Sequence, residues 1–149
     1  DPWLVDSAMA CVAKDSSYQS FEDLKAPGTK FGIASGSVYE SIIAEQFPEA
    51  EIVTLPLGTW QESLASGVID VSLDDSIVFA GPMTENENLR LLPDRGDSYL
   101  YGFAFASGDK SVEVFNLYLT KLKAFGTYAE LYKNWMGFDW EPNNFGTAY

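Results

Sequence analysis

The sequence predicts an α/β fold, with a mainly parallel sheet flanked by helices, and three observations favour it. Short apolar runs alternate along the chain with segments that open on a helix-capping pattern. A hydrophobic fraction of 46% over 149 residues is enough for one compact domain with a buried core. Strands alternating with helices of about ten residues imply right-handed crossovers, which place the helices on the faces of a parallel sheet.

The predicted strands share an apolar run that ends at polar or turn residues. The run Ala-Met-Ala-Cys-Val-Ala ends at Lys14, as a buried strand should. In the fourth strand, Val71 and Leu73 alternate with Ser72 and Asp74, so this strand is less thoroughly covered than a central parallel one. We expect strands over residues 8–13, 30–34, 51–55, 68–73, 88–92 and 99–106.

The predicted helices begin at Ser, Thr or Asp residues that can cap them. Ser37, Thr59 and Thr127 are each followed three residues later by Glu, the spacing of a capping box. Pro and Gly residues close the earlier helices, and apolar residues at helical spacing define the last two. We expect helices over residues 20–25, 37–46, 59–65, 75–81, 112–122 and 127–135.

Composition excludes several classes of function. Twenty-two acidic against nine basic residues give a net charge of −13, which would repel nucleic acid and anionic membrane surfaces. The chain has no histidine and a single cysteine, Cys11, which excludes Ser-His-Asp and Cys-His catalysis, His/Cys zinc sites and an internal disulfide. No Asp-x-Asp-x-Asp-Gly loop and no apolar run near 20 residues occurs, so we expect no metal, no cofactor and no insertion into a membrane.

Six short segments between residues 20 and 137 follow one another in an order typical of one protein family. They are FEDLK at 21, KFGIASGS at 30, FPEAEIV at 47, LASGVID at 64, YGFAF at 101 and GTYAELYKNWMG at 126. Together they resemble the extracytoplasmic solute-binding proteins of polar amino-acid ABC transporters. The resemblance implies a type II periplasmic-binding-protein lobe, in a periplasmic or extracellular location, with a transporter permease as a possible partner.

Complete members of that family have two lobes joined by crossing strands. Asp1-Pro2-Trp3 resembles the point where the chain first leaves the first lobe, which has no counterpart here. We therefore expect residues 1–137 to be a second lobe with its hinge strands and C-terminal helices, and residues 138–149 to be a C-terminal extension along the surface. The aromatic faces of those helices should then pack on this lobe or meet another chain, such as a first lobe or a second copy.

Two positions are the candidate ligand-binding site. Gly36, Ser37 and Val38 form a turn at a helix start, where amide groups and the helix dipole favour an anion such as an α-carboxylate. The resemblance assigns this role to the turn, although Val38 replaces a common second Thr and offers only its amide. It also assigns the ligand's α-ammonium to Asp75, with Asp74 aimed at the ligand side chain, where paired carboxylates favour a cationic group.

Each of these residues also has a purely structural interpretation. Ser37 could simply cap its helix, Asp75 could cap the next one while Asp74 is solvated, and most aromatic residues, Trp60 and Tyr39 among them, should be core.

Three hypotheses about function therefore stay open. The first is half of a clamshell site for an amino acid or similar small zwitterion, without chemistry; the second is an assembly subunit using exposed apolar helix faces. The third, a cyclohexadienyl-dehydratase-like enzyme, is disfavoured because only carboxylates could act as acid or base.

Overall fold

The computed structural model describes residues 1–136 and 139, and the chain divides into two compact units. The sheet unit is Ser7–Asp97, and the terminal unit joins Asp1–Asp6 to Ser98–Tyr149. The predicted C-terminal extension, residues 138–149, lies outside the described residues except for Asp139.

The strands form a mixed sheet, which confirms the α/β class and refines the expected strand directions. Its order is β3-β2-β4-β1-β5, with β6 paired to β1. β2 runs parallel to β3 and to β4, whereas β1 runs antiparallel to β4 and β5. The parallel part is therefore the β3-β2-β4 portion alone. The strands are β1 (Pro2–Ala13), β2 (Lys30–Ala34), β3 (Glu51–Leu55), β4 (Val71–Asp75), β5 (Leu89–Leu91) and β6 (Ser98–Gly102).

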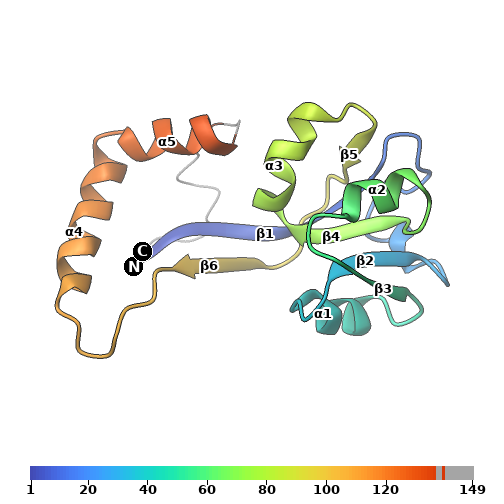
Figure 1. The fold of residues 1–149 in the computed structure, drawn as a ribbon, viewed down its shortest axis with the longest axis horizontal. Helices are drawn as coiled ribbons and strands as arrows, with labels where there is room; N and C mark the ends of the chain where they lie inside the picture. Colours follow the sequence, from blue (N-terminus) through green and yellow to red (C-terminus); the bar gives the residue numbers. More distant parts are fainter. Residues whose placement is uncertain (137–138, 140–149) are drawn as a thin grey trace. The chain divides into compact units, whose positions relative to one another are not determined.

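The helices follow the predicted order, with shifted ends. They are the 3₁₀ helix η1 (Asp23–Lys25) and the α-helices α1 (Tyr39–Gln46), α2 (Trp60–Ala65), α3 (Ser76–Glu85), α4 (Ser111–Ala124) and α5 (Thr127–Met136). Figure 1 shows α1 on one side of the β2-β3-β4 region and α2 and α3 on the other. The sheet unit is thus a sheet with helices on both faces.

The capping boxes are realised only in part. At the predicted start of the first helix, the Asp23 carboxylate accepts hydrogen bonds from the Ser20 amide and hydroxyl, and the Ser20 hydroxyl accepts one from the Asp23 amide, which is the reciprocal pattern of a capping box. Ser37 Oγ accepts a bond from the Tyr39 amide at 3.2 Å. The Thr59 hydroxyl instead donates to the Pro56 carbonyl at 2.9 Å and makes no cap for α2.

Two apolar clusters hold the sheet unit together, one on each face. Alternate residues of the strands separate cleanly: Phe31 and Ile33 of β2 join the cluster under α1, while Met9 and Cys11 of β1 join the cluster under α2 and α3. In the first cluster Phe31 packs on Phe47 with ring centroids 4.8 Å apart. This packing fixes α1 against the strands that carry the candidate site.

The terminal unit is built around the first residues of β1. Tyr128 on α5 donates a hydrogen bond from its hydroxyl to the Trp3 carbonyl at 2.5 Å, and Lys123 on α4 donates to the Pro2 carbonyl at 3.1 Å. Trp3 and Phe115 both pack on Phe103, with centroids 5.6 and 4.9 Å away. Both C-terminal helices therefore contact the first residues of β1.

Much apolar surface of the terminal unit stays exposed nevertheless. Phe125 is 81% exposed and Trp135 80%. Among the described residues of this unit, the other large exposed apolar residues are Leu100, Phe103, Phe105, Val114, Leu117, Tyr118, Leu122 and Leu131. Single exposed apolar residues are ordinary, whereas contiguous apolar patches are typical of interaction surfaces.

Candidate ligand-binding site

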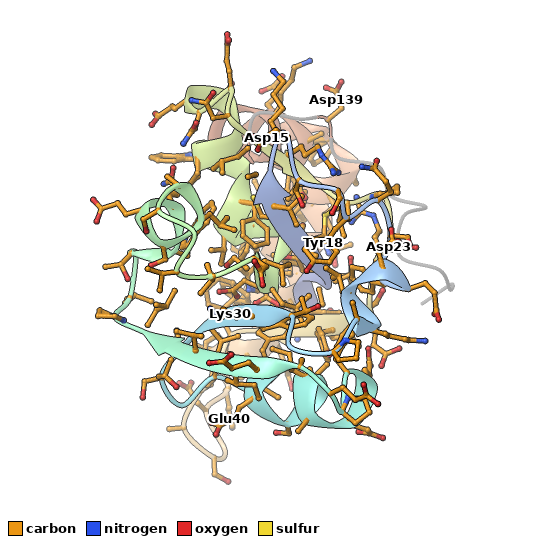
Figure 2. All side chains as sticks on the ribbon, turned by 90° about the vertical axis from the view of Figure 1, so that its right-hand side faces the viewer. Asp15, Tyr18, Asp23, Lys30, Glu40 and Asp139 are labelled. Atoms are coloured by element: carbon orange, nitrogen blue, oxygen red, sulfur yellow. The ribbon has the colours of Figure 1, made fainter. Side chains whose placement is uncertain are left out.

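The candidate residues lie at the carboxyl ends of adjacent parallel strands. β2 pairs with β4 in the register Gly32 with Ser72, and the chain passes from β2 through the turn at Gly36 into α1. Figure 2 looks toward the opposite end of these strands, with Lys30 labelled where β2 begins and Glu40 on α1 beneath the sheet. In open α/β sheets ligands bind beyond the carboxyl ends of the strands, which is where this turn and Asp75 lie.

The turn before α1 has the geometry expected of an anion-binding helix start. Gly36 has φ +73°, a left-handed conformation that favours glycine, and the Ser37 amide donates to the Ala34 carbonyl at 3.2 Å. Because Ser37 Oγ accepts the Tyr39 amide proton, its own O–H proton can point to a further acceptor. Val38 stands at the N-cap position with helical dihedrals and a side chain 62% exposed. The turn can therefore offer a hydroxyl and helix-end amides to a carboxylate.

Asp75 occupies the N-cap position of α3 without capping it. Its backbone is extended, at φ −62° and ψ 145°, and its side chain makes no capping hydrogen bond. Instead the Tyr39 hydroxyl donates to Asp75 Oδ1 at 2.5 Å. Tyr39 is the first residue of α1 and is only 2% exposed, so a core residue links the two candidate positions. The interpretation of Asp75 as a simple helix cap is wrong.

Asp74 points to the other face of the sheet from Asp75. It lines a hollow of about 320 Å³ together with Ser72, Trp60, Gln61 and residues of the loop after β3. Asp74 Oδ1 also accepts the Asp75 amide proton at 2.8 Å. Trp60 packs edge-on against Phe79, with ring centroids 5.1 Å apart, so one part of its ring belongs to the core and another faces the hollow. The hollow is mostly apolar and has one carboxylate.

A second, larger hollow of about 990 Å³ lies at the opposite end of the sheet. Asp15, Lys14 and Asn88 line it, together with residues of the turn after α2. It contains none of the predicted site residues. We place the candidate site at the smaller hollow and the α1 turn, because there a helix start and the carboxyl ends of parallel strands coincide.

The described residues offer no other obvious chemistry. Cys11 is buried in β1, and burial raises the pKa of its thiol to about 12, so it stays protonated and weakly nucleophilic at neutral pH. Within residues 1–136 and 139, no group of three or more His, Cys, Asp or Glu side chains is arranged to hold a metal ion. In the same part of the chain, no helix is long and apolar enough to cross a membrane.

The turn before α1 and Asp75 could be predicted from the sequence, but the residue that links them, Tyr39, could not. Tyr39 looked like a core aromatic, and it is one, but its hydroxyl reaches Asp75 across 36 residues of sequence. The signal that could have found it was the combination of a Tyr in the first turn of α1 with an acid after the neighbouring parallel strand. The loop residues Pro56, Leu57 and Gly58, which line the smaller hollow, carried no signal.

Known proteins resemble the chain in sequence and in fold. A putative ABC transporter arginine-binding protein of Escherichia coli is 28% identical over 87% of the chain and 56% of its own length. The glutamine-binding protein of a Bacillus subtilis ABC transporter is 32% identical over 84% of the chain and 46% of its own length. An ancestral cationic amino acid solute binding protein of known structure superimposes with a TM-score of 0.80 at 28% identity, over 91% of the chain and 60% of that protein.

The chain thus spans about half the length of the curated relatives it matches. No family model matches it. Both curated relatives are named as transport binding proteins and not as enzymes. The chain is therefore homologous to the solute-binding proteins of amino-acid ABC transporters and has the fold of type II periplasmic binding proteins.

Proposed function

We propose that this chain supplies one half of a clamshell site for an amino acid or a similar small zwitterion, outside the cytoplasm and without catalysis. The observation that carries the proposal is the link between Ser37 and Asp75 through Tyr39, which holds an anion-favouring helix start beside a carboxylate. A zwitterion needs both: its carboxylate at the Gly36-Ser37-Val38 turn and its ammonium at Asp75.

The rest of the ligand would pass over the carboxyl ends of β2 and β4, because Asp74 lies on the other face of the sheet from Asp75. Asp74 and the hollow beside Trp60 favour a side chain that is apolar along its length and cationic at its tip. The relatives named for arginine and for cationic amino acids support the same chemical class.

The other half of the site would come from a first lobe, on the same protein or on another chain, and the complete receptor would deliver its ligand to a transporter permease. An isolated half-site loses the contacts of the missing lobe and leaves one face of the ligand in water. We therefore expect the 149-residue chain alone to bind amino acids with a Kd in the millimolar range, about 4 kcal/mol of binding free energy.

Amide NMR titration of the chain with the twenty amino acids tests the proposal. Shifts should concentrate at the turn of α1 and at Asp75, and Ser37→Ala and Asp75→Asn should each weaken binding at least about fivefold. Asp15→Asn, in the larger hollow, is the matched control and should leave binding unchanged. Shifts that cluster around Asp15 instead, or submicromolar binding by the isolated chain, would contradict a half-site at α1.

Assembly is a second candidate function, favoured by the exposed apolar side chains of α4 and α5. A surface with Phe125 and Trp135 in water fits a partner chain better than solvent. Sedimentation velocity over about a hundredfold dilution measures self-association. A stable oligomer that is lost in a Phe125→Ser/Trp135→Ser variant would favour assembly, and a monomer at all concentrations would leave a first lobe as the partner of this surface.

A further inference from the structure

Tyr39 has a position that packing alone does not explain. Its ring lies in the cluster under α1, 2% exposed, among Ile43, Phe31 and other apolar residues. A phenylalanine would fill the same volume, whereas a buried phenol must find a hydrogen-bond partner. The partner here is Asp75 Oδ1, on a different element of the fold.

Both ends of Tyr39 are fixed to the candidate site. Its amide donates to Ser37 Oγ at 3.2 Å, and its hydroxyl donates to Asp75 Oδ1 at 2.5 Å. The first bond belongs to the turn that would receive a carboxylate, and the second to the carboxylate that would receive an ammonium group. One buried residue therefore contacts both of the groups that are proposed to hold the two charged ends of a zwitterion.

We infer that Tyr39 is a positioning residue that fixes the orientation of the Asp75 carboxylate relative to the α1 turn. In this way Tyr39 selects ligands with an α-ammonium group. This inference rests on the function proposed above. Because the phenol donates, it holds one oxygen of the carboxylate. A carboxylate accepts about four hydrogen bonds, so the bond from Tyr39 orients it while using only part of that capacity. An unoriented carboxylate would lose part of its interaction with an ammonium group each time its rotamer changed.

The matched probes are L-arginine and L-glutamine with their desamino analogues, 5-guanidinopentanoate and 4-carbamoylbutanoate. Each analogue keeps the carboxylate for the α1 turn and lacks the ammonium group for Asp75. We expect Tyr39→Phe to weaken binding of the amino acids about tenfold, measured by NMR titration of the full chain, and to change binding of the analogues by less than about twofold. Tyr18→Phe, which removes a 3.4 Å hydroxyl contact with Thr29 elsewhere in the sheet unit, is the control and should change neither.

Comparing the amino acids with their desamino analogues distinguishes a positioning role of Tyr39 from a role in packing alone. A Tyr39→Phe change that only loosened α1 would weaken amino acids and analogues alike, because both use the turn at Ser37, and that result would overturn the inference. When Asp75 is already replaced by Asn, Tyr39→Phe should weaken amino-acid binding by less than about twofold. A further loss of about tenfold in that variant would also overturn the inference. If Ser37→Ala and Asp75→Asn leave binding unchanged, the proposed site itself is wrong.

A double-mutant cycle in urea tests the link without any ligand. Unfolding constants of Tyr39→Phe, Asp75→Asn and the double variant should depart from additivity by at least about threefold. Additive effects would show that the two side chains do not interact, and would overturn the positioning role whatever binds. Clear coupling together with no binding of any probe would instead refute the half-site and, with it, the role of Tyr39 in recognition.

Discussion

Gly32 in the centre of β2 leaves no room for a side chain, so its replacement by alanine tests the packing around this strand. A Cβ at this position would lie 2.4 Å from Ile69 Cδ1 and 2.9 Å from Leu55 Cδ1. Ile69 is only 1% exposed, so it cannot swing into solvent to make space. Overpacking of this kind costs about 1–3 kcal/mol, and the lower entropy of the unfolded alanine chain offsets about 0.5–1 kcal/mol of it. We expect Gly32→Ala to destabilise the sheet unit by about 1–2 kcal/mol.

Ile69→Val provides the compensating change, because it removes the Cδ1 atom that makes the shortest contact. Alone, Ile69→Val should lower the stability of the sheet unit by about 0.5–1.5 kcal/mol. The double variant Gly32→Ala/Ile69→Val should be destabilised by at least about 1 kcal/mol less than the sum of the two single destabilisations. Gly81→Ala in α3, where an added Cβ meets nothing within 4 Å, is the control and should stabilise by about 0.5–1 kcal/mol.

Amide hydrogen exchange within β2 and β4 is the suitable assay, because it reports the opening free energy of the sheet unit and does not require the whole chain to unfold in one step. Exchange in Gly32→Ala as slow as in the unchanged protein would show that the added Cβ causes no overpacking. If Ile69→Val destabilises the Gly32→Ala variant by the same free energy as it destabilises the unchanged protein, the two side chains are not in contact.

Three further predictions concern ionisable groups. Burial, reinforced by the charge of Tyr132, raises the pKa of Tyr128 to about 12, above its ordinary value of 10.0, so the stability that the neutral phenol gives the terminal unit is complete below pH 10 and lost as the pH rises toward 12. Alkaline unfolding should be less steep in Tyr128→Phe, and an unchanged slope would contradict this. The Cys11 thiol, with its pKa raised to about 12 by burial, should react with a thiol reagent at neutral pH only after unfolding; immediate labelling of the native chain would be the opposite result. The Gln19 amide and the Ser20 hydroxyl lower the pKa of Asp23, so its contribution to stability is present above about pH 4 and falls as the pH drops through the folded pKa; carboxyl NMR titration should find this group below the ordinary aspartate range.

The sequence predicted the class of fold and the two ends of the candidate site because both depend on local patterns. Capping residues and glycines mark the start of α1, and an acid after a buried strand marks the end of β4. The antiparallel course of β1 could not be predicted this way, since an apolar run looks the same in either direction and its partners, β4 and β5, lie far along the chain.

Side-chain hydrogen bonds were the least predictable feature. Thr59 has the spacing of a capping box with Glu62, yet its hydroxyl finds the nearer Pro56 carbonyl in the preceding turn. The bond from Tyr39 to Asp75 exists only because β2 and β4 are neighbours, which no local pattern reveals. The ligand-contact roles of Gly36, Ser37, Val38, Asp74 and Asp75 themselves stay predictions.

The division of the chain also governs the order in which its parts can fold during synthesis. The sheet unit, Ser7–Asp97, is one uninterrupted stretch, whereas the terminal unit needs residues from both extremes of the chain. A ribosome adds about 5–20 residues per second, so the sheet unit is synthesised several seconds before Tyr128 is available to bond to the Trp3 carbonyl. The sheet unit can therefore fold first. Once that segment has condensed, it shortens the effective tether between the two extremes, and closing the terminal unit costs less entropy than it would in an unfolded chain.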